Sequence, residues 1–194
     1  YWVFSAATTN VEYTLQVTDT STGAVREYTN PLGQSAEANI DTEAFPCEAG
    51  AKGRLARAMD TLSLAVSSAD ATSLPGQSCS DTDTALCLNA SRFKVEVEWR
   101  DFADKRGSGQ VVPLRSADSG LLWFFDADNW EMLVKVLDGC GVNGSFWVFA
   151  AATTNVEYTL RVTDTSTGQM REYHNPLGQA APALTDTDAF SCGR

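Results

Sequence analysis

The sequence has few basic residues, a single histidine and no long apolar run, and each shortage excludes a class of function. Lys and Arg number 14 against 25 Asp and Glu, which gives a formal net charge of -11. Proteins that grip nucleic acid or anionic membrane surfaces need clustered positive charge, so we expect neither partner. No run of about eighteen apolar residues is present, which argues against a membrane-spanning helix.

The main feature of the chain is a repeat. Residues 1–47 and 146–192 align without a gap at an offset of 145 and agree at 35 of 47 positions. Repetition of this kind indicates duplicated structural modules. Strand-like sequence from Leu86 onward precedes the second copy but not the first. We therefore expect residues 1–47 to be the C-terminal half of a module, 48–78 to be a linker, and 79–194 to be a complete module.

The module is expected to be an all-β, antiparallel sandwich of about eight strands. Apolar and polar residues alternate over 93–99, 11–17 and 156–162, the period of a strand with one buried face. Thr-Ser-Thr-Gly at 20–23 and 165–168 provides hairpin turns, and Gly107 to Gly109 is expected to form a loop. Many short strands with frequent turn signals indicate a sandwich or a barrel, and we favour the sandwich because nothing in the pattern demands closure. In the linker, helical spacing favours a short helix that contains Leu55, Met59, Leu62 and Val66.

The five cysteines show no metal-binding spacing, so they indicate disulfides and an oxidising compartment. Three pairings of the module's four cysteines exist. We favour Cys79 with Cys87 across a short loop, and Cys140 with Cys192 at the ends of two strands. Cys47 stands at the position of Cys192, but the equivalent of Cys140 is absent from the first copy. Cys47 is therefore expected to be unpaired or to form an intermolecular bond.

A half-module at this place is explained either by assembly with another chain or by a proteolytic boundary within the module. For assembly, the half-module is expected to carry an unsatisfied sheet edge. A few strands with one apolar face are marginally stable alone, and an open edge can pair with another chain. The residues that we assign to this assembly edge are Trp2, Phe4, Val11, Tyr13, Leu15 and Val17.

Two other candidate sites are weaker. Asp126, Asp128 and Asn129 crowd one loop, with Asp118 on a nearby turn, and Ca²⁺ favours several hard oxygen ligands from flexible loops. Aspartate and asparagine also make ordinary turns, which is the simpler interpretation. The only histidine, His174, corresponds to Thr29 in the first copy, so a His-based catalytic site is not expected. We expect no enzymatic activity.

The order of segments resembles a family of β domains in the C-terminal regions of secreted bacterial proteins. The resemblance rests on FKVEVEWRDF at 93–102, SGLLWFFD at 119–126, VKVLDG at 134–139, FWVF at 146–149, VEYTLRVTDTSTG at 156–168 and NPLG at 175–178. It covers nearly all of 79–194 and the first copy. It implies an extracellular setting and supplies no catalytic residues.

Two functions remain open at this point. The first is a secreted structural protein whose modules associate end to end with other copies of the chain, by strand complementation, into a fibre or surface layer. The alternative is an extracellular adhesion or glycan-binding module that uses the acidic loop and Trp130, the aromatic residue expected to be most exposed.

Overall fold

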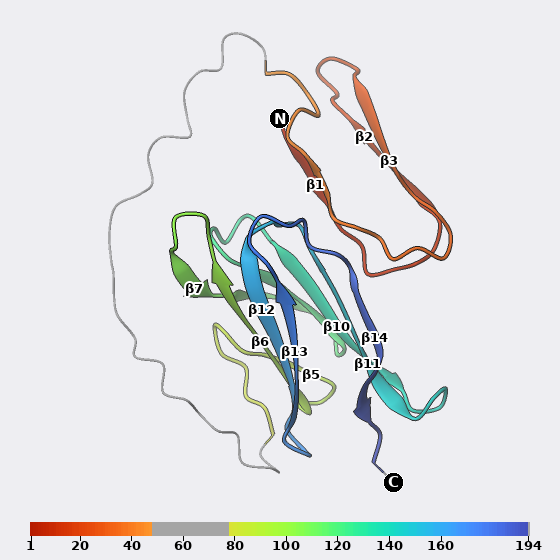
Figure 1. Cartoon of the computed structure of the whole chain (residues 1–194), viewed down its shortest axis with the longest axis vertical. Coiled ribbons are helices and arrows are strands. Elements are labelled where there is room, and N and C mark those ends of the chain that lie inside the picture. The colour runs from red at the N-terminus through yellow and green to blue at the C-terminus, as the bar shows by residue number, and fades with distance from the viewer. Residues whose placement is uncertain (48–77, 194) are drawn as a thin grey trace.

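The computed structural model describes residues 1–47 and 78–193, and within them every regular element is a β-strand (Figure 1). The predicted linker lies outside the described residues except for Ser78. Residues 79–193 form ten strands, namely β5 (Leu86–Leu88), β6 (Phe93–Arg100), β7 (Arg106–Ser108), β8 (Gln110–Arg115), β9 (Ser119–Trp123), β10 (Met132–Gly139), β11 (Ser145–Ala152), β12 (Glu157–Asp164), β13 (Gln169–Asn175) and β14 (Leu184–Ser191).

These strands form two antiparallel sheets. One has the order β14-β11-β10-β9-β8, and the other has the order β13-β12-β6-β5, with β7 also paired to β6. The prediction of an all-β antiparallel sandwich is confirmed. The expected number of about eight strands was too low, because β5 and β7 have only three residues each and show no periodicity. The expected loop around Gly107 belongs in part to β7, where Gly107 pairs with Trp99.

The core lies between the two sheets and is formed by the alternate residues of their strands. On β6 the side chains of Phe93, Val95, Val97 and Trp99 are buried, as the alternation predicted. They face the other sheet, whose buried side chains include Leu122, Val134, Val136, Val148 and Phe190. Burial of these aliphatic and aromatic groups is the main stabilising contribution in a domain of this kind.

The first 47 residues fold as a copy of one half of this sandwich. They contain β1 (Val3–Ser5), β2 (Tyr13–Thr18), β3 (Val25–Asn30) and β4 (Asn39–Asp41). β1 pairs with β4 and β2 pairs with β3, in the registers that β11 and β14 and β12 and β13 use. For example, Tyr13 lies opposite Asn30, and Tyr158 lies opposite Asn175. We call these four strands the half-module and residues 79–193 the module.

The same contacts hold the two layers together in both copies. The Tyr28 hydroxyl donates to Asp41 at 2.8 Å, and Tyr173 donates to Asp186 at 2.7 Å. The Asn30 side-chain amide donates to the carbonyls of residues 11, 31 and 34, and Asn175 makes the equivalent three bonds. The asparagine that begins each NPLG segment therefore fastens two loops.

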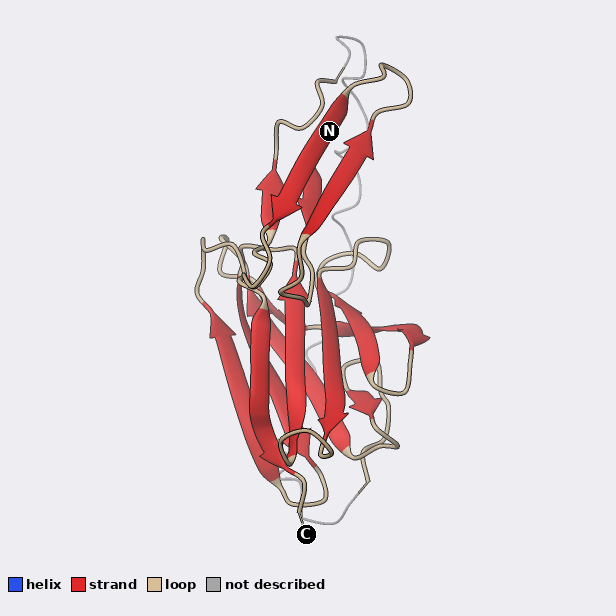
Figure 2. Ribbon diagram, turned by 90° about the vertical axis from the view of Figure 1, so that its right-hand side faces the viewer, coloured by secondary structure: helices blue, strands red, loops and turns tan. Residues whose placement is uncertain are grey.

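The half-module and the module lie end to end (Figure 2). They touch through equivalent segments, since Glu37 forms an antiparallel bridge with Pro182, the residue at its own position in the second copy. The Ala38 amide donates to the Ala181 carbonyl at 3.4 Å. Ser35 lines a cavity of about 330 Å³ together with Tyr173 and Leu184 of the module. Backbone groups of equivalent segments therefore contribute to the contact between the units.

Candidate functional site: the open edges of the half-module

Two sheet edges that are covered by neighbouring strands in the module have no such neighbour in the half-module, among the described residues. In the module β11 pairs with β10 on one side and β14 on the other, while β12 lies between β6 and β13. In the described part of the chain, β1 pairs only with β4, and β2 pairs only with β3. The backbone N–H and C=O groups that correspond to the β10 and β6 contacts are thus left without a strand partner.

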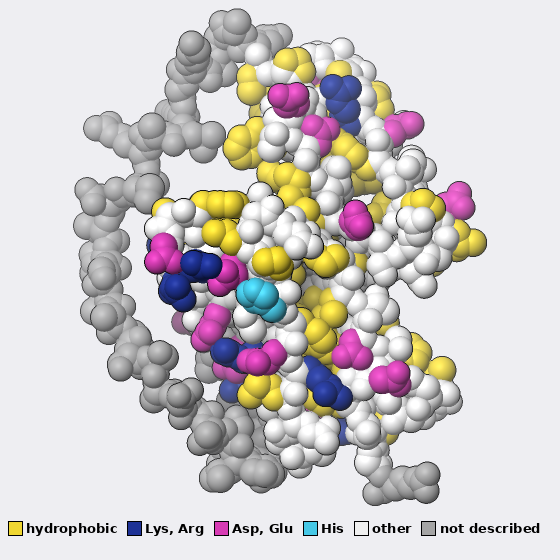
Figure 3. Space-filling view, in the orientation of Figure 1, with side chains coloured by type: hydrophobic (Ala, Val, Ile, Leu, Met, Phe, Trp, Pro, Cys, Tyr) yellow, Lys and Arg dark blue, Asp and Glu magenta, His cyan; other side chains and the backbone are white. Residues whose placement is uncertain are grey.

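The open edges leave apolar side chains at the surface. Val11 is 53% exposed, whereas the equivalent Val156 is 6% exposed. Leu32 is exposed, whereas Leu177 packs against the core of the module. Figure 3 shows hydrophobic side chains reaching the surface over the N-terminal unit. An apolar surface next to unpaired strand edges is typical of a site that binds protein.

The six residues assigned to the assembly edge fall into two groups. Trp2, Phe4 and Val11 are exposed, as expected of an uncovered surface. Tyr13, Leu15 and Val17 are half-buried and face the interior of the half-module. The side chains that flank the β2 edge on the outer face are Thr14, Gln16 and Thr18, all exposed. The sequence assignment missed them because it followed the apolar residues, although the alternation itself places them on the outer face.

Among the described residues, Trp2 lacks two contacts that its equivalent in the module makes with neighbouring residues. In the module the equivalent Trp147 lies over Gly139 of β10, where no space remains for a Cβ atom. The Trp147 indole N–H donates to the Asn143 side chain at 2.8 Å. Trp2 has neither contact in the described residues and is 68% exposed. Trp147 lies on the outer face of its sheet, so the exposure of Trp2 reflects the lack of a neighbouring strand among the described residues.

The charges along the covered edge differ from those along the open one. In the module Arg161 on β12 contacts Glu98 of β6 at 3.2 Å and Glu172 of β13 at 2.6 Å. The half-module has Gln16 in place of Arg161, and Gln16 donates to Glu27, the equivalent of Glu172. This is the only difference between the sequences of β2 and the matching six residues of β12. The open edge therefore lacks the cation that β12 directs toward β6.

A second ion pair also joins the two halves of the module. The Arg92 guanidinium bonds both oxygens of Asp164, at 3.2 and 2.8 Å, and lies over the rings of Phe93 and Phe146. The Asp164 side chain is fully buried. Burial raises the pKa of Asp164, but the hydrogen bonds from Arg92 and Ser166 outweigh it and lower the pKa below its ordinary value. In the described residues, the side chain of Asp19, the equivalent in the half-module, accepts hydrogen bonds only from Ser21 and Thr22.

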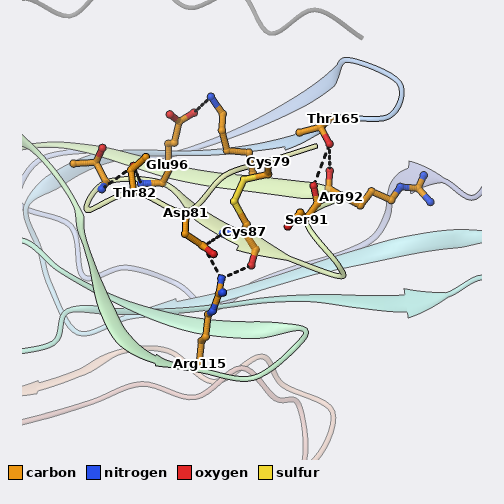
Figure 4. The surroundings of a disulfide bond; sticks show 12 residues. Cys79, Asp81, Thr82, Cys87, Ser91, Arg92, Glu96, Arg115 and Thr165 are labelled. Atoms are coloured by element: carbon orange, nitrogen blue, oxygen red, sulfur yellow. Dashed lines mark hydrogen bonds and ion pairs between the residues drawn. A yellow bond between two sulfur atoms is a disulfide. The ribbon is translucent and has the colours of Figure 1, made fainter. Parts of the chain in front are cut away.

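The disulfides join Cys79 to Cys87 and Cys140 to Cys192, which are the pairs that the sequence favoured. Figure 4 shows the first of them beside Arg115, which donates to Asp81 at 2.5 Å and to the Cys87 carbonyl at 2.8 Å. The second bridge ties the end of β14 to the turn after β10. Among the described residues Cys47 is a free, exposed thiol.

The acidic loop does not form a cluster of ligands. Asp126 accepts a hydrogen bond from the Asp128 amide, and Asp118 bonds Ser116 and Ser119. Within the described ranges, the only group of three Asp, Glu, His or Cys ligand atoms within 4.8 Å of one another is Asp138, Cys140 and Cys192. Its two cysteines are already bonded to each other. The acids of the loop cap turns, and a Ca²⁺ site there stays a prediction.

The sequence did not single out Glu131, which is the buried carboxyl group behind this loop. Its side chain accepts hydrogen bonds from the Phe124 amide and the Asn129 side chain, and the residue is only 3% exposed. Burial raises the pKa of Glu131 to about 7, although both hydrogen bonds act in the opposite direction. Trp130 beside it is 47% exposed, and its indole N–H is taken by the Ala127 carbonyl.

We expect Glu131 to make the module less stable as the pH rises. Because the folded state raises the pKa above the value of 4.5 for a free side chain, it binds the proton more tightly than the unfolded state does. The stabilisation by the bound proton is complete below pH 4.5 and is lost as the pH rises toward 7. The free energy of unfolding therefore falls by up to about 3 kcal/mol over this range. Glu131→Gln should remove the dependence, because the amide stays uncharged. Denaturant unfolding followed by tryptophan fluorescence at pH 5 and pH 8 measures it, and equal pH dependence in both proteins would contradict the assignment.

Comparisons with family models, curated proteins and solved structures find no match to this chain. In the described residues, no helix has the length and apolar character needed to cross a membrane. The two disulfides are compatible with an oxidising, extracellular environment. His174 is exposed and shares a contact of 3.3 Å with the Thr159 hydroxyl.

Proposed function

We propose that this chain is a secreted structural protein of the bacterial cell surface that associates end to end through the open edges of its half-module. The observation that carries the proposal is the comparison of equivalent strands. β11 and β12 are each paired on both sides, whereas β1 and β2 have one described neighbour each. Strands added to these edges would gain main-chain hydrogen bonds and would cover exposed apolar side chains such as Val11.

The half-module is suited to accept strands because its own fold is already set. Tyr28 and Asp41 connect its two ribbons, and Asn30 fastens its loops as Asn175 does in the module. The acceptor edges are therefore held in place before a partner arrives, which lowers the entropy cost of association. Repeated modules joined through these edges, together with a further contact between modules, would build a fibre or a surface layer without any catalytic step.

A charged residue on the β2 edge should weaken the association. Lysine on an edge strand opposes pairing because the charge must be kept in water. We expect Thr14→Lys to raise the dissociation constant of the full chain by at least about fivefold. Sedimentation equilibrium over a range of protein concentrations measures this constant. The matched control is Thr159→Lys at the same position of β12, where β6 already covers the edge.

Two results would contradict the proposal. A wild-type chain that stays monomeric at every concentration would show that the open edges do not mediate association. Equal effects of Thr14→Lys and Thr159→Lys would place the association on another surface.

A further inference from the structure

We propose that the strand added to each open edge is the same strand of a second copy, so that two half-modules form one complete sandwich around a two-fold axis. β1 would pair antiparallel with β1 of the second copy, and β2 with its β2. This inference rests on the proposed function, because it assumes that the open edges mediate association. It adds the identity of the partner and the symmetry of the contact.

The first argument is that, among the described strands, the alternative donors are already used. The strands that cover these edges in the module are β10 and β6, and both are paired along their length with β11 and β12 of their own module. A second copy that gave up β6 and β10 would uncover two equivalent edges of its own. The number of covered edges would not increase. Pairing of two half-modules covers four open edges and uncovers none.

The second argument is electrostatic. A donor like β6 would bring Glu98 next to the outer face of the β2 edge, as it does beside Arg161 in the module. The half-module has Gln16 at this position and so gives that carboxylate no cation. For pairing of β2 with β2 of a second copy, glutamine in place of arginine at position 16 is favourable, because two arginines close to the axis would repel each other. The outer face of β2 in fact offers Thr14, Gln16 and Thr18, which are neutral.

The third argument is geometric. In antiparallel pairing with Leu15 opposite Leu15 of the second copy, Tyr13 faces Val17 and Thr14 faces Gln16, so inward side chains meet inward side chains. The open edges of β1 and β2 lie on the same side of the half-module, because Tyr28 and Asp41 join β3 and β4 on the other side. One axis perpendicular to the sheets therefore pairs both edges at once.

The expected product is a closed dimer with a shared sandwich between two complete modules. A contact between identical surfaces uses each surface once and does not propagate. A fibre would then need a second, different contact in addition to this one.

Cross-linking at a single position tests the symmetry. In the full chain with Cys47→Ser, Thr14→Cys places one thiol per chain beside the axis. We expect a short bis-maleimide to convert this variant into covalent dimers, seen on a denaturing gel. Thr159→Cys in the same background is the matched control and should remain monomeric, because β6 covers that strand in each module. Association of the chain without cross-linking through position 14 would overturn the inference but leave the proposed function standing.

A second variant separates the two kinds of partner by the sign of its effect. Gln16→Arg makes the sequence of β2 identical to the matching residues of β12, where the arginine contacts the equivalent of Glu27 and is tolerated. With a second half-module as partner, the like charges should raise the dissociation constant about two- to fivefold. With a donor like β6, the new contact to Glu98 should lower the constant. Tighter association of Gln16→Arg would therefore overturn the inference, and a chain that never associates would overturn it together with the proposed function.

Discussion

Replacing Cys140 and Cys192 together by serine is expected to lower the free energy of unfolding of the module by about 4 kcal/mol. The bridge spans 52 residues and ties the last strand to the turn after β10. Opening it frees a long loop in the unfolded chain, and the loop-entropy relation gives a cost of this size. Denaturant unfolding of the full chain under non-reducing conditions, with Cys47→Ser in both proteins to prevent thiol exchange, measures the difference.

The other bridge provides the control. Cys79 and Cys87 are 8 residues apart, so their replacement by serine should cost only about 2.5 kcal/mol by the same relation. The chain-entropy explanation therefore predicts an order as well as a size. Equal costs for the two double variants would show that strain or local packing, rather than loop length, sets the contribution of these bridges.

The second large effect is expected at Asp164. Its buried carboxylate accepts two hydrogen bonds from Arg92 and further bonds from the Ser166 amide and hydroxyl. Asp164→Ala would leave the guanidinium of Arg92, which lies between the two halves of the module, without its counter-charge. Removal of one partner from a buried ion pair typically costs about 3 to 5 kcal/mol. We expect a loss near the lower end, because the Arg92 side chain is 28% exposed.

Asp19 is the matched control for Asp164. It begins the same Asp-Thr-Ser-Thr-Gly turn and makes the same bonds to the serine two residues later, but no arginine reaches it in the described residues. Asp19→Ala should therefore change the stability of the chain only slightly. If both substitutions had similar effects, the turn rather than the ion pair would explain the role of Asp164.

The sequence predicted elements best where the side chains alternate over several residues. β6 and β12 follow the alternation closely, because each has one face in the core and a neighbouring strand on both sides. The short strand β7 was interpreted as a loop because it contains a glycine. That glycine is required for packing rather than for a turn. Gly107 leaves space for the Trp99 ring, where a Cβ atom would clash with the indole. A tripeptide gives no period, so only its partner strand reveals that it is a strand.

The candidate site was predictable in part for the same reason. The repeat and the position of Cys47 indicated an incomplete module with an open edge. The apolar residues Tyr13, Leu15 and Val17 lie on the inner face of β2, while Thr14 and Gln16 flank the same edge on its outer face. Polar residues on the exposed face of a strand do not indicate whether a neighbouring strand pairs with its edge. Glu131 was missed because its burial depends on the fold of the whole 124–131 loop.

The sequence by itself determined the all-β class, the division into a half-module and a module, and the match between two sets of strands, because these follow from local alternation and from direct identity between copies. Only the tertiary structure decided which edges are covered and which carboxylates are buried. Asp19 and Asp164 are the same residue in nearly the same local sequence, yet one is partly exposed and the other is fully buried against Arg92. The difference arises from strands distant in the sequence, whose presence or absence beside a given edge no local pattern encodes.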